Sequence, residues 1–137
     1  MESVTSPNSA SARPLGVFIV EDSPIVRGRI EEMLAEIPGA FPAGFASAAG
    51  QAIQKILECH PNVVLLDMQL AQGSGLDVLR TVRPQRPATV FYMFSNFSTL
   101  IYRRIALQLG AAAYYDKTSE IGDLRNAIAV LASQSVH

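Results

Sequence analysis

The chain of 137 residues has a single cysteine, no tryptophan and almost balanced charge. Because Cys59 is alone, no disulfide can form within the chain, as is typical of proteins in a reducing compartment. The 11 Lys and Arg residues are offset by 12 Asp and Glu residues, so we expect no basic surface for nucleic acid or an anionic membrane. No apolar run is long enough to span a bilayer, and the N-terminus lacks the apolar segment of a secretory signal. We therefore expect a cytoplasmic protein that binds neither nucleic acid nor membrane.

Nearly half of the residues, 49%, are hydrophobic, which is enough for one domain with one hydrophobic core. The first fourteen residues, MESVTSPNSASARP, are rich in serine and have no apolar pattern, so we predict a flexible arm at 1–14. The remainder, 15–137, is predicted to form one folded domain.

After the arm, five short apolar runs alternate with five segments of helical periodicity. Ser23 followed by Pro24 is a typical helix start, and Pro38-Gly39 ends the same helix. The predicted strands are 16–20, 41–46, 62–67, 89–94 and 112–115. The predicted helices are 24–37, 49–59, 76–82, 98–109 and 119–133. Strict alternation of strand and helix predicts an α/β fold.

The first, third and fourth predicted strands are apolar almost throughout, so both of their faces should be buried. This is typical of a parallel sheet covered by helices on both sides. Pro42 favours an edge position for the second strand, because proline cannot donate to a central ladder. We therefore predict a doubly wound, five-stranded parallel sheet, in which ligands bind at the carboxyl ends of the strands.

Polar residues follow four of the predicted strands at this carboxyl edge. They are Glu21-Asp22, Asp67, Ser95-Asn96 and Lys117. Taken singly, each has an ordinary explanation: Asp22 could be a cap or turn residue, and Lys117 a solvated charge. Together they bring three carboxylates, a hydroxyl and an ammonium group to one edge, which predicts a common functional pocket.

The chemistry of such a pocket follows from its charges. Carboxylates that lie close together repel one another unless a counter-charge is present, and carboxylate oxygens are ligands that Mg²⁺ prefers. A bound cation would neutralise incoming phosphate oxygens, and an aspartate can act as a nucleophile that forms an aspartyl phosphate. Lys117 and the Ser95 hydroxyl would contact the oxygens of the transferred group. Asp67, at the end of the run V-V-L-L-D, is therefore predicted to be the reactive group.

Four stretches carry a resemblance to a known family: V-F-I-V-E-D-S-P, V-V-L-L-D-M-Q-L-A-Q-G-S-G-L-D-V-L, V-F-Y-M-F-S-N and G-A-A-A-Y-Y-D-K. With them the sequence resembles a response-regulator receiver domain of two-component signalling, over residues 15–134. The resemblance implies a flavodoxin-like (βα)5 fold with strand order 2-1-3-4-5. It also implies a switch that is driven by phosphorylation and is not an enzyme with a separate substrate, although it could catalyse its own phosphorylation and dephosphorylation.

The same resemblance assigns roles to individual residues. Asp67 would be the phosphoacceptor, and Asp22 and Asp67 would bind Mg²⁺ together with the backbone carbonyl of Gln69. Glu21 would assist through water. The catalytic set would be Asp67, Lys117 and Ser95, and the switch pair would be Ser95 and Tyr114.

Two departures from the family pattern stand beside these matches. Ala71 replaces a common proline, and we expect little effect from it. Thr118 follows Lys117 where the family usually has proline, often after a cis peptide bond. Because a cis bond before a non-proline residue costs about 2.5–4 kcal/mol, we predict either a trans bond with a rearranged loop or a strained bond.

Gln69 and Phe97 would flank the path of the water that hydrolyses the aspartyl phosphate. Because Phe97 is bulky and apolar, it should obstruct this water, and we predict slow self-dephosphorylation. Alternatively, Phe97 packs beneath the fourth helix.

The expected partners follow from the resemblance and from the length of the chain. A histidine kinase or a histidine phosphotransfer protein would be the donor, with Ile25 and Arg29 as candidate contacts. No output domain follows the last predicted helix, so we expect a stand-alone receiver that acts through an unknown downstream protein. Two hypotheses cover the apolar residues of the fourth helix: a partner or homodimer face, or burial against a neighbouring helix. These residues are Leu100, Ile101, Ile105, Leu107 and Leu109.

Three other classes of protein are alternatives to this resemblance. A haloacid-dehalogenase-type phosphatase needs a second aspartate two residues after the nucleophile, where Gln69 stands. A dinucleotide-binding domain needs G-x-G-x-x-G after the first strand, where E-D-S-P-I-V is found. The alternative that stays open is a receiver-like scaffold that is never phosphorylated, which would have no need of the polar set at the carboxyl edge.

Overall fold

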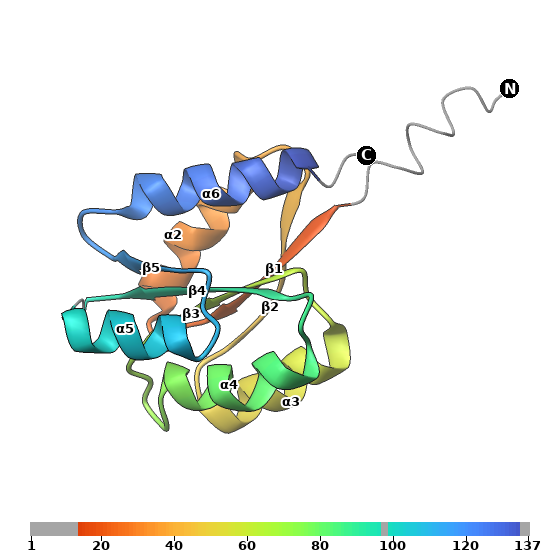
Figure 1. Cartoon of the computed structure of the whole chain (residues 1–137). Helices are drawn as coiled ribbons and strands as arrows, with labels where there is room; N and C mark the ends of the chain where they lie inside the picture. Colours follow the sequence, from red (N-terminus) through yellow and green to blue (C-terminus); the bar gives the residue numbers. More distant parts are fainter. Residues whose placement is uncertain (1–13, 97–98, 135–137) are drawn as a thin grey trace, which may run out of the picture.

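The computed structural model describes residues 14–96 and 99–134, which form one sheet between two layers of helices (Figure 1). The five strands are β1 (Leu15–Val20), β2 (Ala40–Ala46), β3 (Val63–Leu66), β4 (Val90–Ser95) and β5 (Ala113–Asp116). The helices are α2 (Pro24–Ala35), α3 (Ala49–Cys59), α4 (Gly75–Val82), the short 3₁₀ helix Arg83–Gln85, α5 (Leu100–Gln108) and α6 (Ile121–Gln134). The predicted arm at 1–14 lies outside the described residues, except for its last residue.

All strand pairs in the sheet are parallel, and the strand order is β2-β1-β3-β4-β5. Helices α2 and α6 cover one face, and α3, α4 and α5 cover the other (Figure 1). This confirms the predicted doubly wound fold and its order. The loops that leave the carboxyl ends of the strands therefore meet at one edge.

Each face of the sheet has its own core because successive side chains of a strand point to opposite faces. Phe18 and Val20 pack with α3 and α4, whereas Val17 and Ile19 pack with α2 and α6. All six residues of β1 and all four of β3 are buried. The continuous apolar runs of these strands are thus explained by helices on both sides.

Strand β2 lies at the edge, as Pro42 predicts. Its register with β1 shifts by one residue, because Pro42 pairs with Val17 while Gly44 pairs with Phe18. Gly44 has φ of +152°, and a Cβ there would lie 3.0 Å from the Phe18 ring. Glycine is required at this bulge because the ring packs directly over the backbone.

Side-chain caps fix where α2, α4 and α5 begin. The Ser23 hydroxyl accepts the Val26 N–H at 3.3 Å, and the Ser74 hydroxyl accepts the Leu76 N–H at 3.0 Å. Helix α5 begins later than predicted because Thr99 is its cap and accepts the Tyr102 N–H at 3.3 Å. Among the described residues, no helix has both the length and the hydrophobicity needed to cross a membrane.

Candidate functional site

Three carboxylates meet where β1 and β3 end. One carboxylate oxygen from each of Glu21, Asp22 and Asp67 lies within 4.8 Å of the others. The adjacency follows from the sheet: Val20 pairs with Leu66, and the Asp67 N–H donates to the Val20 carbonyl at 3.0 Å. Glu21 and Asp67 are buried, whereas Asp22 is half-buried. The predicted acidic cluster is therefore present and opens toward solvent on the side of Asp22.

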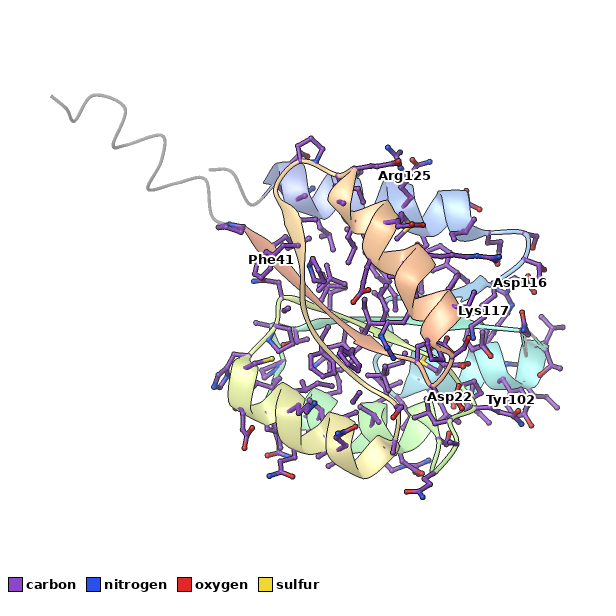
Figure 2. The ribbon with its side chains drawn as sticks, turned by 180° about the vertical axis from the view of Figure 1, so that it is seen from behind. Asp22, Phe41, Tyr102, Asp116, Lys117 and Arg125 are labelled. Carbon is purple, nitrogen blue, oxygen red and sulfur yellow. The ribbon has the colours of Figure 1, made fainter. Side chains whose placement is uncertain are left out.

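Lys117 provides the counter-charge. Its Nζ atom lies 2.7 Å from Glu21 Oε1 and 2.9 Å from Asp67 Oδ2. The loop after β5 carries it there, and the Lys117 N–H donates to the Ser95 carbonyl at 3.1 Å. Figure 2 shows Lys117 and Asp22 at the same end of the molecule. The structure thus brings the Lys117 ammonium group to the acidic cluster, as the sequence predicts.

Burial and ion pairing act in opposite directions on these charges. Burial raises the pKa of Glu21 above its ordinary value, and the contact with Lys117 only partly offsets this. Burial also disfavours the charged form of Lys117, but its bonds to Glu21 and Asp67 outweigh that effect and raise its pKa. The lysine therefore stays protonated at neutral pH and holds the carboxylates together.

The donor set fits a hard divalent cation. Three carboxylates and one ammonium group leave a formal charge of −2 at the cluster. Oxygen ligands of this charge are those that Mg²⁺ selects, usually with several waters retained. The Gln69 N–H donates to Asp67 Oδ1 at 3.4 Å, which brings this residue beside the cluster. The role of its carbonyl as a ligand stays a prediction.

Gly75 is a site residue that the sequence reasoning missed. A Cβ on Gly75 would collide with the Asp67 carbonyl oxygen, and its N–H donates to the Met68 carbonyl at 3.0 Å. The loop between β3 and α4 therefore folds back directly onto the backbone of the reactive aspartate. Its only signal in the sequence is the pair of glycines around Ser74, which also fits an ordinary helix start.

The two candidate switch residues contact each other. Ser95 at the end of β4 is fully buried, and Tyr114 on β5 is 5% exposed. The Tyr114 hydroxyl is hydrogen-bonded with the Ser95 side chain, and burial raises the pKa of Tyr114 despite this bond. Met93 pairs with Tyr114, so adjacent strands place the two side chains together. The structure brings these residues together, while their switching role stays a prediction.

Thr118 is accommodated by a turn built on Asp116. No peptide bond is cis within the described ranges, so the bond before Thr118 is trans. Asp116 Oδ1 accepts the Thr118 N–H at 2.8 Å, its hydroxyl at 2.6 Å and the Ser119 N–H at 3.1 Å. The trans bond of the first predicted alternative is confirmed. The same turn delays the start of α6 to Ile121.

The two candidate partner contacts, Ile25 and Arg29, lie on the surface. Ile25 is 71% exposed and Arg29 is also exposed. Arg29 lines a cavity of about 200 Å³ together with Lys117 and Thr118. Phe97, with its predicted effect on water, lies outside the described residues.

The hypothesis that the apolar residues of α5 are buried against a neighbouring helix is wrong for Leu100, Ile101 and Leu107, which are exposed. Ile105 and Leu109 are half-buried.

Comparison with known proteins agrees with this geometry. The family described as response regulator receiver domain matches residues 17–129, and the chain belongs to this family. The chain is 30% identical over 105 residues to the transcriptional activator protein ExaE of Pseudomonas putida, covering 77% of this chain and 49% of the relative. It is also 30% identical over 122 residues to a protein-glutamate methylesterase/protein-glutamine glutaminase of Trichodesmium erythraeum, covering 88% of this chain and 35% of the relative.

A solved structure shows the same fold. The two-component response regulator of the LuxR family from Aurantimonas sp. SI85-9A1 superposes with a TM-score of 0.81 and 26% identity, covering 88% of this chain and 86% of that one. The chain spans about half of ExaE and about a third of the methylesterase. The matched region is therefore only part of each of these two relatives.

Proposed function

We propose that the protein is a phosphorylation-dependent signalling switch that accepts a phosphoryl group on Asp67 with Mg²⁺. The observation that carries this is the position of Lys117, whose Nζ contacts both Asp67 and Glu21 at the buried end of the sheet. A buried cluster of carboxylates and lysine is costly to desolvate, and as a whole it adds little to stability compared with apolar side chains of similar volume. The receiver-like scaffold that is never phosphorylated gives no reason for such an arrangement.

The transfer would use the described residues as follows. An Asp67 carboxylate oxygen attacks phosphorus and the new O–P bond forms as the N–P bond of a phosphohistidine donor breaks. The departing ring keeps the electron pair of that bond and leaves as neutral imidazole because its other ring nitrogen carries a proton. Oδ2 is held by Lys117 at 2.9 Å, so the opposite oxygen, Oδ1, is the better placed nucleophile. Lys117 then contacts an oxygen of the transferred group. Mg²⁺ held by Asp22, Asp67 and the Gln69 carbonyl, with Glu21 through water, would neutralise phosphate charge.

The same proposal covers partners and location. A sensor histidine kinase or a histidine phosphotransfer protein would dock over Ile25, which is exposed, and Arg29, which lines the same cavity as Lys117. Phosphorylation would act on Ser95 and Tyr114 and change the surface near α5, which a downstream protein or a second copy of the chain would contact. A cytoplasmic location fits a phosphoryl exchange of this kind. The protein would act as a switch without a separate substrate of its own.

The test is phosphorylation by acetyl phosphate with Mg²⁺, followed by intact mass. We expect one added phosphoryl group on the wild type and none on Asp67→Asn. The matched control is Asp77→Asn, because Asp77 is an exposed aspartate that forms a surface ion pair with Arg80. Equal labelling of wild type and Asp67→Asn would reject the assignment of Asp67. No labelling of any form would favour the scaffold.

A further inference from the structure

Arg103 on α5 reaches two other elements at once. Nη1 donates to the Tyr114 carbonyl on β5 at 3.0 Å, and Nη2 donates to Glu120 Oε1 at 3.0 Å. The same Glu120 oxygen accepts the Asp116 N–H at 2.8 Å. The planar guanidinium is suited to hold two acceptors in fixed directions. A single side chain therefore joins α5, β5 and the residue that precedes α6.

The rest of α5 is packed lightly. Within Leu100–Gln108 the buried residue is Ala106, whereas α4 buries four residues along a similar length. The apolar side chains of Leu100, Ile101 and Leu107 face solvent. Because apolar burial is small here, the polar contacts of Arg103 contribute a larger share of what holds α5 on the sheet than in the other helices.

Arg103 also covers the ring of Tyr114. The guanidinium carbon lies 5.3 Å from the ring centroid, a cation–π distance. Tyr114 is 5% exposed, and its hydroxyl is hydrogen-bonded with Ser95 at the other end of the ring. The tyrosine is thus held at its backbone carbonyl, its ring face and its hydroxyl. An outward rotation of the ring would lose the contact with Arg103 as well as the one with Ser95.

We propose that Arg103 is a clasp that holds Tyr114 in its buried position against Ser95 and thereby links that position to the placement of α5. Arg103 is a positioning residue, since it acts through the Tyr114 carbonyl and Glu120, to which its guanidinium donates. The hold on Tyr114 stands on contacts in the structure alone. The link from Tyr114 to phosphorylation of Asp67 rests on the proposed function.

The first experiment measures the position of Tyr114 by fluorine NMR. The full chain is labelled with 3-fluorotyrosine, and the Tyr114 signal among the four tyrosines is assigned with Tyr114→Phe. In Arg103→Met we expect the ratio of buried to exposed Tyr114 to fall by about five- to tenfold, as for loss of a charged hydrogen bond with a cation–π contact. The matched control is Arg104→Met, the exposed neighbour on the same helix, which should leave the signal unchanged.

Two further variants separate the clasp from general destabilisation. Glu120→Gln removes the ion pair but keeps an oxygen for the Asp116 N–H, and we expect a shift of about two- to threefold. Arg103→Lys keeps the charge but cannot bind both acceptors as a fork, and it should lie between the wild type and Arg103→Met. A Tyr114 signal that is the same in Arg103→Met and wild type would overturn the clasp.

The second experiment measures the link to the acidic cluster. Amide hydrogen exchange of α5 is followed with and without Mg²⁺ and beryllofluoride, a mimic of the aspartyl phosphate. We expect these additions to slow α5 exchange in the wild type and to have at most half that effect in Arg103→Met. An equal response in both proteins would refute the link through Arg103. No response even in the wild type would count against the proposed function, while the fluorine spectrum still decides the clasp.

Discussion

Replacing Lys117 with methionine tests whether the lysine is the counter-charge that keeps the acidic cluster folded. The variant keeps a long apolar stem and removes the ammonium group that lies 2.7 Å from Glu21 and 2.9 Å from Asp67. Removing one partner of a buried ion pair typically costs about 3–5 kcal/mol, because the remaining charge is left without compensation. The Lys117 side chain is 12% exposed, and proton uptake by Glu21 relieves part of the repulsion. We therefore expect a loss of about 2–3 kcal/mol at neutral pH.

Magnesium should restore part of this loss. Without the lysine the three carboxylates carry a formal charge of −3 in place of −2, so the cation gains more from binding. At a concentration ten times its dissociation constant, a ligand that binds only the folded state adds about 1.4 kcal/mol. We expect added Mg²⁺ to stabilise Lys117→Met more than it stabilises the wild type.

The assay is urea unfolding followed by circular dichroism, since the chain has no tryptophan. The control is Lys55→Met, the same change at a half-buried lysine of α3 whose Nζ donates to the Phe45 carbonyl at 3.3 Å. That variant should change the free energy of unfolding by less than about 1 kcal/mol. If Lys117→Met without Mg²⁺ were as stable as the wild type, Lys117 would not be needed as a counter-charge and the reasoning would fail.

Two further predictions concern the backbone and the pH dependence of the site. Gly75→Ala should lower the free energy of unfolding by about 2 kcal/mol or more and weaken Mg²⁺ binding, because the added Cβ would collide with the Asp67 carbonyl. The control Gly50→Ala, on the open face of α3, should be neutral or stabilising by about 0.5–1 kcal/mol. Urea titration measures the stability and calorimetry the Mg²⁺ binding, and a Gly75→Ala protein of normal stability would contradict the close packing. Burial raises the pKa of Glu21 above its ordinary value of 4.5, so its contribution to stability is largest below that pH and is lost as the pH rises through the folded-state pKa. Glu21→Gln should therefore lose less stability than the wild type between pH 4.5 and pH 7 in urea titrations, and an identical pH profile would show that Glu21 is not penalised by burial.

The fold and the acidic cluster could be predicted because they depend on patterns local to the sequence. The apolar runs of β1 and β3 indicated burial on both faces, and Pro42 indicated the edge strand. Once the sheet is parallel, its carboxyl ends must meet, so the side chains after β1, β3, β4 and β5 are brought to one edge. The contact of Lys117 with Asp67, fifty positions earlier, follows from that topology.

Other features depend on contacts that no local pattern encodes. The apolar residues of α5 gave no sign of which side faces the sheet, because they occur on more than one side of the helix, and Leu100 and Ile101 prove to be exposed. The fork of Arg103 between Tyr114 and Glu120 joins residues of three elements whose spacing is set only by the fold. Thr118 departs from the family pattern, and the turn around Asp116 that accommodates it is visible only in the structure.

The central claim is that Asp67 itself carries the phosphoryl group, and chemical trapping tests it most directly. The wild-type protein is incubated with acetyl phosphate and Mg²⁺, reduced with borohydride, which converts an aspartyl phosphate to homoserine, and mapped by peptide mass spectrometry. The account predicts homoserine at position 67 alone, and only when both donor and Mg²⁺ are present. Homoserine at Asp22 with none at Asp67, or no conversion at any aspartate, would contradict it.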